Sequence, residues 1–139
     1  MLSVVITASC SVEGINNNSI NSNMSVISSQ NIELPTPVKE FVEAVNAGDE
    51  SAFLSFFDEA KGSINDWGRI MTGHKEIKAW SDKEFIGAKG KMTPQRVEVT
   101  GNVISLWAGW KSNYYSGDSK FVFTTDGNKV IEMRIESAK

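Results

Sequence analysis

The chain has 139 residues with 14 basic and 17 acidic side chains, a net charge of −3 with histidine neutral, and this length suits one domain with a single core. All 14 basic residues lie at or after Lys39, but acidic residues balance them, so neither a basic stripe for nucleic acid nor a polybasic membrane patch is expected. These numbers argue against a nucleic-acid partner.

The first ten residues contain an apolar run that ends in small residues before Cys10, and a long polar tract follows. This order is similar to a bacterial lipoprotein signal with Cys10 as the lipidated residue, although Thr7 stands where an aliphatic residue is usual. We therefore expect segment 1–10 to be a signal and the chain to be extracytoplasmic, with membrane contact only through a lipid anchor. The alternative is an N-terminus without targeting function on a cytoplasmic chain.

Residues 11–34 are rich in Ser and Asn and show neither the helical nor the strand period of apolar residues. A segment that cannot bury a face behaves as a flexible linker. The globular domain is therefore predicted to span 35–139.

Two helices are predicted at the start of this domain. Thr36 is a suitable N-cap for the first and Pro37 suits its first turn, while Asp49 or Ser51 would cap the second. One stripe of each helix is apolar, namely Val38, Phe41, Val42 and Val45 in the first and Phe53, Phe56, Phe57 and Ala60 in the second. Both helices need a broad apolar surface to cover.

The next stretch, 63–87, is predicted to begin as a short extended segment that carries Asp66 and Trp67. A glycine turn then leads into a helix that contains Trp80. Residues 89–136 follow as four strands, because hairpin signals at 101–102 and 126–128 separate runs of alternating apolar residues. The alternating apolar residues are Val97 and Val99, then the more apolar face with Ile104, Leu106, Ala108 and Trp110, then Phe121, Phe123 and Thr125, and finally Ile131, Met133 and Ile135.

Helices that precede a run of strands favour an α+β fold, with the helices packed on one face of a curved antiparallel sheet. The phrase from Gly73 to Trp80, GHKEIKAW, follows a strand that carries Asp66, and the chain ends in the strand VIEMRI at 130–135. This order resembles the nuclear transport factor 2-like superfamily, and more narrowly its small SnoaL-like bacterial members. The resemblance implies a cone in which the helices and a strongly curved sheet enclose a pocket. It also implies frequent homodimers through the outer sheet face, where Trp107 would lie.

Asp66 is the candidate catalytic residue. In ketosteroid isomerase-like members, the resemblance implies, a carboxylate on the corresponding strand acts as general base. The alternative, which the sequence favours because short polar residues before glycine commonly form turns, is that Asp66 caps the turn at Trp67 and Gly68. The resemblance also implies a protonated acid on a sheet strand that stabilises an enolate, but residues 99–117 contain no Asp, Glu or His.

Tryptophan and methionine side chains are the candidates for a ligand pocket, which would suit a flat apolar or aromatic molecule. The predicted lining is Trp67, Trp80, Met92, Trp110, Phe123 and Met133; the alternative is that Trp80 and Trp110 are core residues. His74 is the single histidine, so we expect no histidine-based metal site and no cofactor.

Three functions remain open at this point. The first is the binding of a small apolar or aromatic ligand, and the second is a cofactor-independent isomerase or lyase with Asp66 as base. The third is an interaction module that uses the outer sheet face around Trp107.

Overall fold

The helices and strands of the domain are described by a computed structural model that covers residues 32–139, of which Glu33–Lys139 form one compact unit. In chain order the elements are α1 (Thr36–Ala47), α2 (Glu50–Ser55), β2 (Ser63–Asp66), β3 (Arg69–Thr72), α3 (Gly73–Glu84), β4 (Lys91–Thr100), β5 (Val103–Lys111), β6 (Ser116–Asp126) and β7 (Lys129–Ser137). Segment 1–10 with Cys10, and the predicted linker as far as residue 31, lie outside the described residues. No helix within 32–139 is long and apolar enough to cross a membrane.

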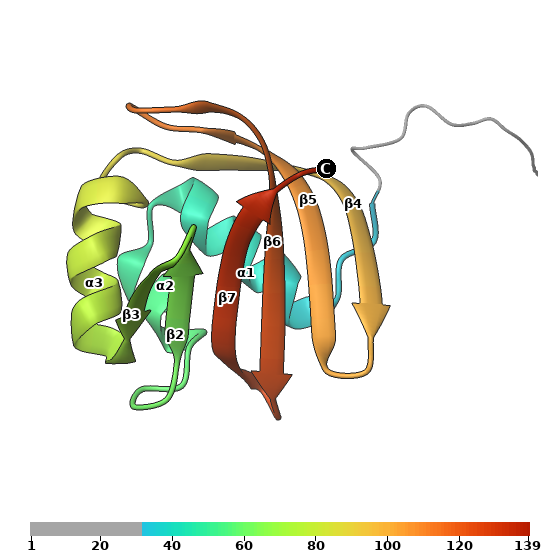
Figure 1. Cartoon of the computed structure of the whole chain (residues 1–139), viewed down its shortest axis with the longest axis horizontal. Helices are drawn as coiled ribbons and strands as arrows, with labels where there is room; N and C mark the ends of the chain where they lie inside the picture. Colours follow the sequence, from blue (N-terminus) through green and yellow to red (C-terminus); the bar gives the residue numbers. More distant parts are fainter. Residues whose placement is uncertain (1–31) are drawn as a thin grey trace, which may run out of the picture. The chain divides into compact units, whose positions relative to one another are not determined.

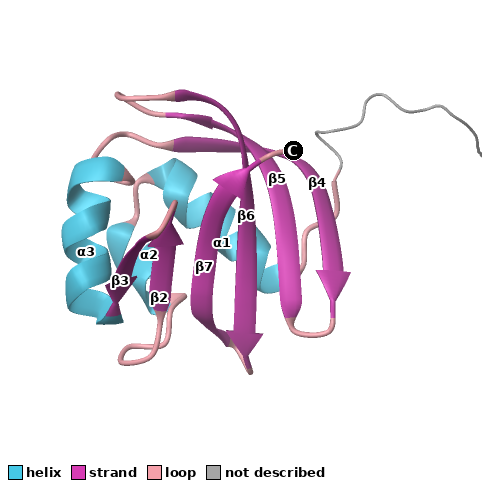
Figure 2. Cartoon of the chain, in the orientation of Figure 1, coloured by secondary structure: helices cyan, strands magenta, loops and turns pink. Residues whose placement is uncertain are grey.

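The sheet has six strands in the order β3-β2-β7-β6-β5-β4. All neighbours are antiparallel except β2 and β7, which are parallel. Helices α1 and α2 lie behind the sheet in Figure 1, α3 lies beside its β3 edge, and β4, β5 and β6 bend at one end toward α3. Figure 2 shows the three helices gathered on one side of the strands. The predicted α+β fold, with helices on a curved and mainly antiparallel sheet, is confirmed.

Helix α1 begins after Pro35, with Pro37 in its first turn, and ends at Gly48, whose φ of 70° closes the helix in the left-handed conformation. Asp49 caps α2 because its Oδ1 accepts a hydrogen bond from the backbone N–H of Ala52 at 3.1 Å. Of the two predicted caps for this helix, the structure selects Asp49.

The core is built around a cluster of phenylalanines. Phe41 is the centre, with ring centroids of five other phenylalanines between 4.9 and 6.4 Å away. Those five are Phe53, Phe56, Phe57, Phe85 and Phe123. Tilted and edge-on aromatic contacts add to the stabilisation that burial itself provides. The cluster joins α1 and α2 to the sheet.

Two local predictions are corrected by the strands. The turn after Trp67 leads into strand β3, which pairs with β2 in a hairpin, rather than directly into a helix. On β7 the inward alternation predicted for Ile131 fails, because a register shift at Thr124/Thr125 places Val130 in the core and leaves Ile131 half-buried. The N–H and C=O of Val130 also bond the end of α2, at Phe56 and Asp58.

Candidate functional site

The β2–β3 turn is the local structure that positions the site. Its cap is Asn65, whose Oδ1 accepts a hydrogen bond from the backbone N–H of Gly68 at 2.7 Å. Trp67 has a φ of 54° and an indole that is 68% exposed. The alternative in which Asp66 caps this turn is therefore wrong, since Asn65 fills that role and frees the Asp66 carboxylate for other partners.

Asp66 receives two hydrogen bonds, and both reach the same oxygen. Arg69 Nη2 donates to Oδ2 at 2.7 Å, and the indole Nε1 of Trp80 donates to Oδ2 at 3.1 Å. The Asp66 side chain is 18% exposed. Among residues 32–139, no protein donor contacts its Oδ1 within hydrogen-bonding distance, which leaves that oxygen available to a bound molecule.

Arg69 joins Asp66 to the end of α3. Its Nη1 and Nη2 donate to the two carboxylate oxygens of Glu84 at 2.9 and 2.6 Å, a bidentate arrangement that fixes the guanidinium plane. These hydrogen bonds raise the pKa of Arg69, with Glu84 contributing more than Asp66, and the Arg69 hydrogen bond lowers the pKa of the Glu84 carboxyl. A cation with this environment stays protonated and ties the hairpin to the helix.

Three stacked rings form one wall of the site. Phe85 lies between Trp80 and Trp110, with centroid distances of 4.9 and 4.5 Å and interplanar angles of 27° and 13°. Gly90 makes room for the stack, since a Cβ built there would lie 2.0 Å from Cη2 of Trp110. The stack is thus held by the connection from α3 to β4 as well as by the sheet.

These elements enclose a cavity of about 300 Å³. It opens beside the β2–β3 turn and the loop between β5 and β6. Its lining consists of seven aromatic residues, two acids, two serines and one isoleucine: Asp66, Trp67, Trp80, Glu84, Phe85, Trp110, Ser112, Tyr114, Tyr115, Ser119, Phe121 and Ile135.

The structure places four of the predicted site residues at this cavity and three elsewhere. Asp66 and the tryptophans Trp67, Trp80 and Trp110 line it. The expected lining residues Met92, Phe123 and Met133 are at most 3% exposed and do not, which corrects their assignment.

These three residues lie in the core and not at the cavity for different reasons. Met92 is held under α1, because Asn46 bonds both its N–H and its C=O at 2.7 and 2.9 Å. Phe123 packs on Phe41, and Met133 pairs with Ile64 deep in the sheet. Both lie inside the phenylalanine-rich core rather than at the aromatic cavity.

Sequence reasoning missed Glu84, Phe85, Tyr114 and Tyr115 as lining residues. The tyrosines precede β6 in a turn, where Asn113 N–H bonds the carbonyl of Ala88 at 2.9 Å. That contact links residues 25 positions apart, so no local pattern brings the loop to the site. Glu84 could have been found from its place one helical turn after Trp80.

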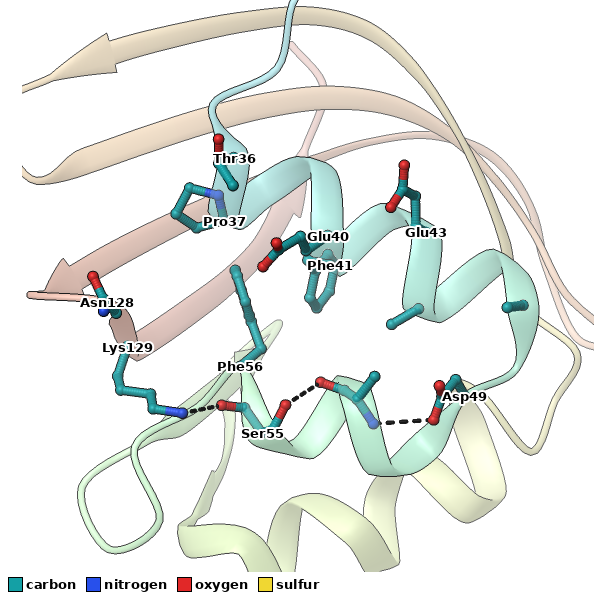
Figure 3. A pocket seen from close by; sticks show the side chains of 13 residues that line it. Thr36, Pro37, Glu40, Phe41, Glu43, Asp49, Ser55, Phe56, Asn128 and Lys129 are labelled. Atoms are coloured by element: carbon teal, nitrogen blue, oxygen red, sulfur yellow. Dashed lines mark hydrogen bonds between the residues drawn. The ribbon is translucent and has the colours of Figure 1, made fainter.

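A second and larger hollow, of about 840 Å³, lies between α1, α2 and the β6–β7 turn (Figure 3). Two of its polar side chains are engaged within the chain: Lys129 Nζ donates to the Ser55 carbonyl at 2.6 Å, and Asp49 accepts from the Ala52 N–H at 3.1 Å. It contains none of the predicted site residues. The smaller aromatic cavity is therefore the better candidate site.

The remaining candidates lie away from the cavity. The Nε2 of His74 lies 3.0 Å from the Phe57 carbonyl oxygen, a local contact between α3 and the segment after α2. Within residues 32–139 there is no cluster of three or more His, Cys, Asp or Glu side chains suited to a metal ion.

Trp107 is on the outer sheet face and is half-buried by its own neighbours. Its Nε1 donates to the Ala138 carbonyl at 3.1 Å, while Arg96 and Lys120 lie 4.1 and 5.0 Å from its ring centroid. Both ring contacts are in the range of cation–π interactions. The indole is thus stabilised within the monomer, and its role in an interface stays a prediction.

Comparison with known proteins identifies the fold. No protein-family model matches the chain, and no curated protein sequence matches it. Among solved structures, a proposed polyketide cyclase from Sinorhizobium meliloti aligns with a TM-score of 0.67 at 19% identity, over 79% of this chain and 100% of the other. The domain has the nuclear transport factor 2-like fold.

Two further structures share the nuclear transport factor 2-like fold at similarly low identity. A protein of unknown function from Cytophaga hutchinsonii has a TM-score of 0.64 at 16% identity, over 76% of this chain and 91% of the other. A protein with the ketosteroid isomerase-like fold from Catenulispora acidiphila, solved in complex with trimethylamine, has a TM-score of 0.63 at 19% identity, over 76% and 88% of the two chains. The predicted nuclear transport factor 2-like fold is confirmed.

Proposed function

We propose that the domain binds a small molecule with an apolar or aromatic body in the aromatic cavity. The observation that supports this most strongly is the lining, because seven of its twelve residues are aromatic. Ligand sites in proteins are typically concave and mostly apolar with a few convergent polar groups. Here the convergent polar groups are Asp66, Glu84 and two serines.

The size of the cavity limits the ligand. Its volume of about 300 Å³ lies at the lower end of the range for small-molecule sites. The ring stack of Trp80, Phe85 and Trp110 is packed against itself and gives the cavity a rigid wall. A flat and compact ligand fits these limits better than a long chain does.

Tryptophan fluorescence provides the test. Titration with neutral aromatic probes such as indole and coumarin, followed by protein emission and by ligand-observed NMR, should give saturable binding. Trp67→Ala should remove the response without loss of the fold, because this indole is largely exposed. Trp107→Phe is the matched control on the outer face and should bind as the parent does. Equal binding by Trp67→Ala and the parent would assign the probes to another site.

A second candidate function is a cofactor-independent isomerase or lyase with Asp66 as general base. It is favoured by one contact pattern: Arg69 and Trp80 both bond Oδ2, so Oδ1 can accept a proton from a substrate in the cavity. Asp66→Asn should retain the Trp80 hydrogen bond and the fold but abolish turnover of a confirmed substrate. Full activity in Asp66→Asn would end this assignment and leave ligand binding intact.

A further inference from the structure

The charges around the aromatic cavity favour a positively charged ligand. Among its lining residues there are two acids, Asp66 and Glu84, and no Lys, Arg or His. Arg69 compensates one of these charges, since it bonds both oxygens of Glu84 and only Oδ2 of Asp66. The site therefore has a formal charge of −1, with Asp66 Oδ1 as its unengaged oxygen. An anionic ligand would be repelled there, whereas a cation would be attracted.

Three aromatic residues at the opening are largely exposed, although the Tyr115 ring lies against Gly117 on one side. Trp67, Tyr114 and Tyr115 are 68%, 75% and 54% exposed, and they are three of the five large apolar side chains exposed within residues 32–139. None of the three contacts another aromatic ring in a stacked or edge-on pair, and no Arg or Lys of the described residues covers them. Exposed aromatic groups that gather at one opening mark a recognition surface.

The backbone presents Trp67 at a cost. A bulky residue with a φ of 54° is rare, because its Cβ approaches the carbonyl oxygen in the left-handed region. The conformation is nevertheless fixed by the Asn65 cap on Gly68. Local strain of this kind is characteristic of functional sites, where the surrounding structure holds it in place.

From this combination we infer that the ligand carries an alkylated ammonium group, tertiary or quaternary, which the faces of Trp67, Tyr114 and Tyr115 contact while Asp66 neutralises its charge. This inference rests on the proposed function, since it names the chemistry of a ligand in the same cavity. Aromatic faces attract a cation through the ring quadrupole, and Trp does so most strongly.

An alkylated ammonium suits this site better than a primary one. A primary ammonium has three N–H donors that each need an acceptor, and it is strongly hydrated. At the opening only Asp66 Oδ1 is an unengaged carboxylate oxygen. Methyl groups on nitrogen remove that demand and pack directly on the rings, so that charge and apolar surface are satisfied together.

The test compares choline with its neutral carbon isostere, dimethylbutanol, in which a quaternary carbon replaces the nitrogen. The two compounds have the same shape, so any difference in affinity reports the charge. NMR titration of the four tryptophan indole resonances of the full chain should show that choline binds about tenfold more tightly than dimethylbutanol. This difference is the effect of a partly desolvated cation–π contact. The shifts should centre on Trp67.

Two variants that each remove one negative charge serve as the matched pair. Asp66→Asn should reduce the preference for choline to about twofold or less, because it removes the charge next to the rings. Glu98→Gln lies on β4 away from the cavity and pairs with Arg96; it should leave the preference unchanged. A primary amine of similar size, ethanolamine, should bind more weakly than choline.

The possible outcomes separate the two proposals. If dimethylbutanol binds as tightly as choline and Trp67→Ala abolishes both, the cation inference is wrong and apolar ligand binding stands. If neither compound perturbs the indole resonances at millimolar concentration, the cation inference also fails, and the neutral aromatic probes decide the proposed function independently.

Discussion

Trp67 has both an unfavourable backbone conformation and an exposed side chain, and each of these lowers the stability of the fold. Its left-handed backbone costs roughly 1 kcal/mol for a side chain of this kind, and its indole, 68% exposed, recovers little by burial. Asn tolerates the left-handed region because its short amide can bond locally.

Trp67→Asn should therefore raise the free energy of unfolding by roughly 1 kcal/mol while it removes ligand binding. Chemical denaturation and the probe titration measure the two effects on the same sample. A variant that is less stable than the parent would show that the indole makes a stabilising contact that its exposure conceals.

The Oε2 atom of Glu50 is the one buried side-chain nitrogen or oxygen within residues 32–139 that has no hydrogen-bond partner, although the residue as a whole is only half-buried. Burial raises the pKa of this carboxyl, and the neighbouring Asp82 raises it further, while Lys78 acts in the opposite direction. The folded state thus disfavours the Glu50 carboxylate relative to the unfolded chain, where the pKa is near 4.5. Stability is lost as pH rises from this value through the higher pKa of the folded state.

Glu50→Gln should remove that penalty. At pH 7 the variant should be more stable than the parent, by roughly 1 kcal/mol or less because the group is near the surface. The difference should disappear as pH falls below about 4.5, where Glu50 is protonated in both states. Urea denaturation from pH 4 to 8 measures this, and a constant difference across the series would mean that titration of Glu50 is not its origin.

At the scale of elements, the connection between α3 and β4 decides the shape of the cavity. The connection brings Gly90 against the Trp110 indole, with space for hydrogen only. It also receives the β5–β6 turn, through the bond from Asn113 N–H to the Ala88 carbonyl. The ring stack, the tyrosines and the helix end are therefore coupled through one short loop.

Gly90→Ala should force the Trp110 ring out of the stack and destabilise the domain by about 1 to 3 kcal/mol, the usual range for an overpacked site. Ligand affinity should fall with it. Trp110→Phe in the Gly90→Ala background should recover part of the lost stability, because the smaller ring leaves room for the new methyl group. A double variant as unstable as the sum of the two single changes would exclude this steric coupling.

At the scale of the whole molecule, the open question is association through the outer sheet face. Trp107, Arg96 and Lys120 form one patch there, and the cation–π contacts keep the indole ordered in the monomer. The homodimer and the interaction module stay predictions, as do the extracytoplasmic location and the lipid on Cys10, which lies outside the described residues.

Trp107→Glu is the test of the dimer. If the outer face pairs with a second copy, the change should convert a dimer into a monomer, because it removes the apolar indole from the interface and places a carboxylate there. Light scattering gives the mass of both proteins. Circular dichroism checks that the variant is folded, and an unchanged mass in a folded variant would remove Trp107 from the interface.

The sequence by itself determined the two N-terminal helices, the helix with Trp80, the four C-terminal strands, the apolar faces of α1 and β5, and the place of Asp66 and Trp67 beside a glycine turn. It did not show strand β3, and it made the second helix too long, since α2 ends at Ser55 and Ala60 is exposed. These features depend on local propensity and on period, which are written in neighbouring residues. The Asp49 cap and the glycine that ends α1 follow from the same local rules.

Only the tertiary structure decided which aromatic residues face the cavity and which fill the core. Met92 and Phe123 are large apolar residues, as Trp110 and Phe85 are. Whether such a residue lies in the core or at the cavity depends on where α1 covers the sheet and where α3 leaves it open. The pairing of Arg69 with Asp66 and Glu84 likewise joins a hairpin to a helix end. Such contacts arise from long-range packing, which pattern and propensity in a single sequence do not encode position by position.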